Sequence, residues 1–101
     1  MSELAIFSQA ADADLDAIWF YGAQTWGADQ ADSYFDQIFD IAEMLTEMPA
    51  IGRKLEWGAG DIRVYFHKSH VIIYRTSPGR MMVLRVLGAR QDWMAVLGGD
   101  A

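Results

Sequence analysis

The sequence predicts an α+β fold: an N-terminal edge strand, an αα-hairpin, and a three-stranded antiparallel meander packed on the helices, followed by a short C-terminal helix. Three observations support this order, β-α-α-β-β-β. Apolar residues recur at helical spacing through residues 15–45, and three strand-like runs separated by short turns follow from residue 62. The run Val71–Tyr74 is continuously apolar or aromatic, which is typical of a strand buried on both faces. The strand over 70–75 should therefore be the middle of the sheet.

Length and composition indicate a single intracellular domain. A chain of 101 residues has room for one hydrophobic core, so residues 1–101 are expected to form one domain. There is no cysteine, which excludes disulfides and thiolate metal sites. We find no signal peptide and no apolar run of about eighteen residues, so we expect a cytoplasmic protein without a membrane segment.

Charge is divided unevenly along the chain. Residues 1–52 contain ten acids and no Lys or Arg, whereas residues 53–101 contain all eight Lys and Arg with four acids. The halves carry net charges of −10 and +4 within the total of −6. This division indicates one face that repels nucleic acid and another that attracts an anionic partner. The alternative is that acidic helices only keep the chain in solution.

The first elements are a short strand over 3–7 and a helix capped by Ser8, whose hydroxyl can accept a hydrogen bond from a first-turn amide. Gly22 lies on the apolar face of this helix and indicates close approach of a second backbone, and Gly27 is expected to end the helix. That face consists of Leu15, Ile18, Trp19, Gly22 and Trp26.

A second helix follows at once, from about Asp29 to Pro49, so the two helices must fold back on each other as a hairpin. Its apolar stripe consists of Tyr34, Phe35, Ile38, Phe39, Ile41, Ala42 and Leu45. Its polar side carries a row of carboxylates at Asp36, Asp40, Glu43 and Glu47. We interpret this row as a solvated face, since like charges at this spacing cost little and a metal site is the rarer explanation.

The second half of the chain is predicted to form two consecutive β-hairpins. Residues 62–67 alternate as a strand, and Lys68–Ser69 is short enough for a tight turn into the central strand. Pro78–Gly79 fits a type II turn leading into a strand over 81–87. Asp92 is then placed to cap the last short helix.

Basic residues gather on the meander together with polar aromatic side chains. A sheet with one face on the helical hairpin is expected to leave its other face free. Arginines among apolar residues on that face would form a cationic surface suited to an acidic amphipathic peptide or to phosphates. The alternative is ordinary surface arginines that cover neighbouring strand residues. The candidates are Arg63, Arg75, Arg85, Arg90, Tyr65 and His67.

Little in the sequence indicates catalysis. His67 and His70 flank the predicted turn, but no acidic or third ligand lies nearby, so we expect no metal site and no cofactor. Tyr65 and His67 with the arginines could in principle cleave RNA, with a base activating the 2′-OH and an arginine stabilising the phosphorane. No nucleophile elbow, phosphate-binding loop or dinucleotide-binding turn is present. The pattern does not assign any catalytic residue.

Five short runs, in a fairly specific order, carry a resemblance that covers residues 3 to 93. They are Ala13–Trp19, Trp26–Gly27, Met48–Arg53, Ser69–Arg75 and Val83–Leu87. In this order they resemble ParE toxins, which belong to the RelE/ParE superfamily of type II toxin–antitoxin systems. The resemblance implies an antiparallel sheet packed on a helical hairpin and inhibition of DNA gyrase. It also implies neutralisation by an acidic ParD-like antitoxin that folds on binding, in a hetero-oligomer.

A toxin of this kind needs no catalytic residues of its own. Its antitoxin would be expected on the basic sheet surface and in an apolar groove with cationic rims. Thirteen aromatic residues are more than a core of this size must hold, so some are expected to form that groove. The candidates are Trp19, Trp26, Tyr34, Trp57 and Trp93.

Two alternatives stay open. RelE-type relatives cut mRNA on the ribosome, typically with a C-terminal tyrosine or histidine, whereas this chain has no tyrosine after Tyr74 and no histidine after His70. ParE-like chains commonly carry a histidine where this chain has Gly88, which puts any role of that side chain in doubt. The second alternative is a non-toxic scaffold that oligomerises through exposed aromatic residues.

Overall fold

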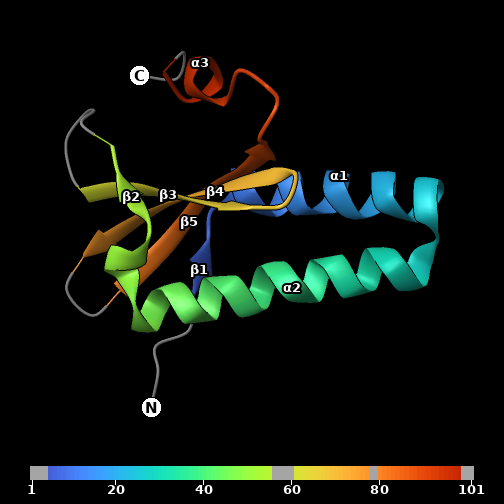
Figure 1. The fold of residues 1–101 in the computed structure, drawn as a ribbon, viewed down its shortest axis with the longest axis horizontal. Helices are drawn as coiled ribbons and strands as arrows, with labels where there is room; N and C mark the ends of the chain where they lie inside the picture. Colours follow the sequence, from blue (N-terminus) through green and yellow to red (C-terminus); the bar gives the residue numbers. More distant parts are fainter. Residues whose placement is uncertain (1–4, 56–60, 78–79, 99–101) are drawn as a thin grey trace.

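The computed structural model describes residues 5–55, 61–77 and 80–98. A mixed five-stranded sheet of order β1-β5-β4-β3-β2 is covered on one face by a helical hairpin (Figure 1). The elements are β1 (Ile6–Phe7), α1 (Gln9–Trp26), α2 (Ala28–Glu47), the 3-10 turn η1 (Pro49–Ile51), β2 (Arg53–Lys54), β3 (Asp61–His67), β4 (His70–Ser77), β5 (Arg80–Gly88) and α3 (Trp93–Gly98). The predicted fold class and element order, including the short C-terminal helix, are confirmed.

Strand β4 lies in the middle of the sheet, as predicted. Its residues Val71–Tyr74 are at most 1% exposed. Ile72 and Tyr74 pack in the core beneath the helical hairpin, whereas Val71 and Ile73 pack in a second core on the opposite face. The continuous apolar run is therefore explained by burial on both faces.

The helical hairpin forms as its capping and spacing residues predict. The Ser8 hydroxyl accepts a hydrogen bond from the Ala11 amide at 3.0 Å. Gly27 alone joins α1 to α2 with φ +102°, a backbone conformation that residues with a side chain rarely adopt. A Cβ placed on Gly22 would lie 3.4 Å from the Cβ of Ala31. The expected close approach of the two helices is confirmed at this position.

The second face of the sheet is not free, contrary to the expectation. Helix α3 lies over part of it (Figure 1), and Trp93, only 7% exposed, packs against Val64, Val71 and Leu87. The Asp92 carboxylate accepts the Ala95 amide at 3.4 Å, as predicted for the cap of this helix. A strand that is apolar on both faces needs a cover on each, and α3 supplies the second one.

Two short edge strands complete the sheet. β1 pairs in parallel with β5 through Ile6 and Met82, and β2 pairs with β3 through Arg53 and Val64. The sequence did not predict β2, because two residues have no measurable period. The predicted Pro78–Gly79 turn lies outside the described residues.

A β-bulge in β5 changes which of its side chains face the helices. The pairing with β4 shifts between Ile73 and Tyr74, so that Leu84 is the extra residue. Val83 and Val86 both pack in the core beneath the hairpin despite their odd spacing of three. Simple alternation along β5 would place Arg85 on the same face as Val83, and the bulge prevents this.

The buried hydroxyl of Tyr74 joins the central strand to the turn after α2. It donates to the Pro49 carbonyl at 2.7 Å and accepts the Gly52 amide at 3.0 Å. A Cβ on Gly52 would collide with this hydroxyl and lie 2.8 Å from two ring carbons of Tyr74. Two of the sequence runs, 48–53 and 69–75, are thus in direct contact through one side chain.

We expect Tyr74→Phe to lower the free energy of unfolding by about 2 kcal/mol, because a buried carbonyl and a buried amide lose their partner. Gly52→Ala should cost about 3 kcal/mol through overpacking. Urea unfolding monitored by circular dichroism measures both. The double variant should not recover the loss, since the ring carbons remain. Recovery to the level of Tyr74→Phe alone would show that only the hydroxyl matters. Tyr21→Phe, at an exposed site, is the control.

Candidate functional site

A cleft of ≈ 1010 Å³ opens between α1, the Lys68–Ser69 turn, the end of β5 and α3. Figure 1 shows the tip of the β3–β4 hairpin close to α1. The lining residues are Asp14, Ala17, Ile18, Tyr21, Trp26, Gln30, Ala31, Tyr34, Lys68, Ser69, His70, Arg85, Val86, Leu87, Gly88, Gln91 and Val96. Apolar and aromatic side chains share this lining with polar and charged ones, and some of the polar side chains form two hydrogen-bonded groups.

One polar group of the cleft is centred on Tyr34, from α2. Its hydroxyl lies 2.6 Å from Nδ1 of His70 and 3.5 Å from the carbonyl oxygen of His67. Nε2 of His67 in turn lies 2.9 Å from Oε1 of Gln37. These contacts hold the tip of the β3–β4 hairpin against α2.

Burial keeps this group uncharged near neutral pH. It lowers the pKa of His70, and the nearby His67 lowers it further. Burial also lowers the pKa of His67, with a contribution from the Lys68 charge, and it raises the pKa of the Tyr34 hydroxyl. Neutral imidazole and protonated phenol are the forms that can share a short hydrogen bond here.

The second polar group is an ion pair between Asp14 of α1 and Arg85 of β5. Arg85 donates from Nε to Oδ2 at 2.8 Å and from Nη2 to Oδ1 at 2.9 Å, which makes the contact bidentate. The Val86 amide also donates to Asp14 Oδ2, at 2.9 Å. Arg85 is therefore bound within the fold, where the sequence predicted a binding residue on a free face.

Three of the predicted binding residues lie on the helix-facing side of the sheet. Arg63 donates to the Gly52 carbonyl at 2.8 Å and pairs with Asp61, whose pKa is lowered mainly by a hydrogen bond from Thr76 and further by the Arg63 charge. Tyr65 packs against the core beneath the hairpin, and the His67 ring stacks on Tyr34. The expectation that Arg63, Tyr65 and His67 belong to a cationic surface on the free face was wrong, because the face they share is the one that the helical hairpin covers.

The exposed arginines of the strands lie instead on the open part of the second face. Arg75 pairs with Ile62 and Met82, and Met82 pairs with Ile6, so all four side chains share this face by register. Arg53 and Arg80 belong to the same face by pairing and alternation, and both are exposed. The only acid in the five strands is Asp61, on the other face. We call this surface the cationic strip: Ile6, Arg53, Ile62, Arg75, Arg80 and Met82.

The remaining predicted residues are spread over several places. Arg90 is exposed in the turn after β5. Trp26 and Tyr34 line the cleft, whereas Trp19 lines a separate hollow of the hairpin. Trp93 is a core residue of the second face, and Trp57 lies outside the described residues. Of the four aromatic candidates that the structure describes, two therefore lie in one groove.

Neither a metal site nor a membrane segment is found where the structure describes the chain. No group of three or more His, Cys, Asp or Glu is placed to hold a metal ion in residues 5–55, 61–77 and 80–98. No described helix is both long and apolar enough to cross a membrane. The acidic row on α2 is exposed, as a solvated face should be.

Comparison with known proteins identifies the family. The sequence-family model for the ParE toxin of the type II toxin–antitoxin system parDE matches residues 5–93. The chain belongs to the ParE toxin family. It is 37% identical over 91 residues to Toxin ParE1 of Caulobacter vibrioides, covering 90% of this chain and 94% of that protein. It is 35% identical over 97 residues to Toxin ParE1 of Mycobacterium tuberculosis, covering 91% and 95%.

The fold of this ParE toxin also matches a solved structure. A chain of the chromosomal ParDE TA system from P. aeruginosa superposes with a TM-score of 0.71, covering 86% of this chain and 96% of that one. At 18% sequence identity, this match concerns the fold alone. The family resemblance carried by the five short runs is confirmed by the family model and by the two relatives.

Sequence reasoning missed several residues that shape the cleft and the strip. Asp14 is separated from Arg85 by 71 positions, and no local pattern connects them. Arg53 and Arg80 were not among the predicted binding residues, because their shared face depends on the register of β2 and β5. One signal was available: Asp14 precedes Ile18 by four positions, which places it beside the apolar face of α1.

Asp14→Ala should lower the free energy of unfolding by about 2–3 kcal/mol, since Arg85 and the Val86 amide lose their acceptor in a site where the two side chains are only 14% and 22% exposed. A double-mutant cycle with Arg85→Ala, followed by urea unfolding, isolates the pairwise part. Asp12→Ala, on the exposed side of the same helix, is the control. Equal losses for Asp12→Ala and Asp14→Ala would contradict the role of the ion pair.

Stability should fall as the pH drops below about 6.5, the ordinary pKa of histidine. The unfolded chain then binds a proton at His70 that the folded chain, with its lowered pKa, does not yet bind. Urea unfolding at pH 7.5 and pH 5.5 should therefore show a smaller decrease for His70→Gln than for the unaltered protein. Parallel decreases would mean that His70 is not the group responsible.

Proposed function

We propose that this ParE toxin inhibits DNA gyrase and that an acidic ParD-like antitoxin neutralises it by binding the cationic strip. Membership in the ParE family supports the toxin role, and the family description names a parDE pair. The strip is the observation that supports the mode of neutralisation. It combines three exposed arginines with exposed Ile6 and Met82, with no carboxylate on the same face of the strands.

The strip suits a partner segment that is acidic on one side and apolar on the other. Carboxylates on such a segment could pair with Arg53, Arg75 and Arg80, while its apolar side chains cover Ile6 and Met82. A segment that folds on binding can follow an extended surface of this kind. The cleft at the other end of the sheet is a second, partly apolar surface that the same antitoxin could reach.

Inhibition by binding is favoured over RNA cleavage by the positions of the candidate catalytic groups. Arg63 and Arg85 are held by Gly52 and Asp14, and His67 by Gln37. Tyr65 packs against the core beneath the hairpin. Groups engaged in this way support the fold and are poorly placed to act together on an RNA phosphate. The gyrase target rests on the family resemblance.

Expression of the toxin without antitoxin should stop growth, and the purified toxin should block supercoiling by DNA gyrase and increase the amount of cleaved DNA. Supercoiling of a relaxed plasmid measures this directly. The control is topoisomerase I, which should be unaffected. If protein synthesis stops first and mRNA shows new cuts near codons while gyrase is unaffected, the ribosome-dependent alternative is correct.

Antitoxin binding and growth with coexpressed antitoxin test the cationic strip. Arg75→Glu with Arg80→Glu should stay toxic but bind the antitoxin about tenfold or more weakly, because the reversed charges repel an acidic segment. Coexpressed antitoxin would then fail to restore growth. Lys54→Glu reverses one charge on the opposite face of β2 and should remain neutralised. Normal neutralisation of the double variant would place the antitoxin elsewhere without affecting the gyrase result.

A further inference from the structure

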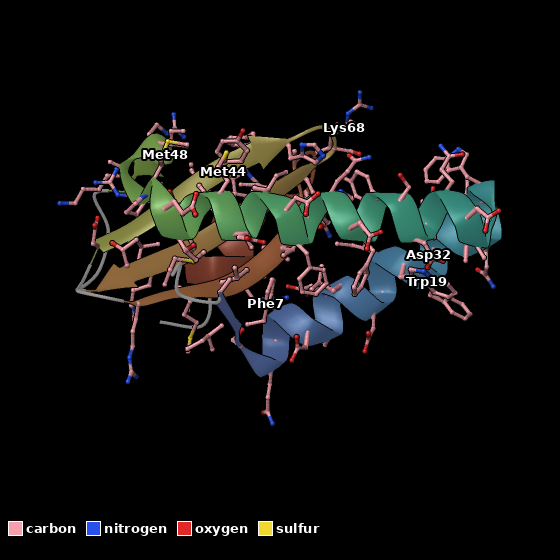
Figure 2. All side chains as sticks on the ribbon, turned by 90° about the horizontal axis from the view of Figure 1, so that it is seen from below. Phe7, Trp19, Asp32, Met44, Met48 and Lys68 are labelled. Carbon is pink, nitrogen blue, oxygen red and sulfur yellow. The ribbon has the colours of Figure 1, made fainter. Side chains whose placement is uncertain are left out.

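A second hollow lies in the helical hairpin, away from the cleft and from the cationic strip. It measures ≈ 450 Å³ and is lined by Asp16, Trp19 and Phe20 of α1 with Asp32 and Phe35 of α2. We call these five residues the aromatic box. Figure 2 shows Trp19 and Asp32 next to each other towards the end of the hairpin where α1 passes into α2. None of the five residues lines the cleft.

Helical spacing brings these side chains together. Asp16, Trp19 and Phe20 stand at i, i+3 and i+4 on α1, which places them on one face of the helix. Asp32 and Phe35 are three positions apart on α2 and face them across the hairpin. The Trp19 indole N–H donates to Oδ1 of Asp32 at 2.7 Å, which fixes the indole ring and the carboxylate relative to each other.

The charges of the box are unbalanced within the chain. Asp16 and Asp32 form no ion pair with any of the described residues, and Asp14 is the one hairpin carboxylate that does. The hairpin holds nine acids and no Lys or Arg between residues 9 and 48. Its field therefore attracts cations towards the box, most strongly at low ionic strength.

Aromatic rings add a preference that carboxylates alone would not have. Ring faces are negative and apolar, so they favour cations that carry little bound water, such as guanidinium and alkylammonium groups. Phe20 is 60% exposed beside Asp16, an arrangement that leaves a large apolar ring in water unless something covers it. A small hydrated metal ion would gain nothing from the three rings.

We propose that the aromatic box binds an arginine side chain of a protein partner. The planar guanidinium can stack on a ring and donate a hydrogen bond to Asp32 Oδ2, which the indole does not use. The hairpin extends beyond the sheet (Figure 1), so a residue on the surface of another protein can reach the box. The inference does not depend on whether that partner is DNA gyrase.

Two-dimensional NMR of the intact toxin tests the proposal with the blocked peptide Gly-Arg-Gly and its citrulline counterpart, which keeps the shape but lacks the charge. The Trp19 indole N–H signal is assigned by its loss in Trp19→Phe. We expect the arginine peptide to shift this signal and the citrulline peptide to leave it in place. A shift of equal size with citrulline would overturn the proposal, because charge would then be irrelevant.

Variants separate the box from the general charge of the hairpin. Asp16→Asn and Phe20→Ala should each weaken binding of the arginine peptide about two- to fivefold, as expected for loss of a carboxylate or a ring at an exposed cation site. Asp40→Asn removes the same charge from the same hairpin outside the box and should leave the affinity unchanged. If it weakens binding as much as Asp16→Asn, the attraction is only the overall field. Tighter binding of tetramethylammonium than of the arginine peptide would also overturn the assignment to arginine.

Discussion

Burial of strand β4 on both faces is the constraint on which the rest of the structure depends. Because Val71–Tyr74 have no side to turn towards water, the sheet must be covered twice. The helical hairpin covers one face completely enough to bury Ile72 and Tyr74, and the six-residue helix α3 covers part of the other through Trp93. The unequal length of the two covers leaves the cationic strip open. The surface that we propose for the antitoxin is thus a consequence of how the central strand is packed.

The open edge of β5 is closed by side chains of α1 and of the turn before α3. β1 pairs with only two residues of β5, and beyond it the Ser8 hydroxyl donates to the Leu84 carbonyl at 2.7 Å. Asp14 accepts the Val86 amide, and Gln91 accepts the Gly88 amide at 2.7 Å. An edge strand with unpaired backbone groups invites association with other chains, and these contacts occupy three of those groups. Asp14, which makes one of these contacts, also holds Arg85 in its ion pair, so Arg85 has a structural role.

The division of charge along the sequence becomes a division in space. The nine acids belong to the hairpin on one face of the sheet, and the arginines of the strip lie on the other face. The molecule therefore offers two chemically distinct surfaces. An acidic antitoxin and an arginine of another protein would bind to different layers. Both ligands could then be bound at once, unless the antitoxin also extends around the hairpin edge.

The sequence by itself determined the helices, the central strand and the order of elements, because these follow from local spacing, from the Ser8 cap and from Gly27. It also located Trp26 and Tyr34 among the groove residues. Only the tertiary structure decided that Leu84 is a bulge, that Arg85 pairs with Asp14, and that Trp93 is core. The physical reason is that strand register and the packing of layers bring together residues far apart in the chain. Local periodicity specifies which elements form, but not which side chains they place opposite one another.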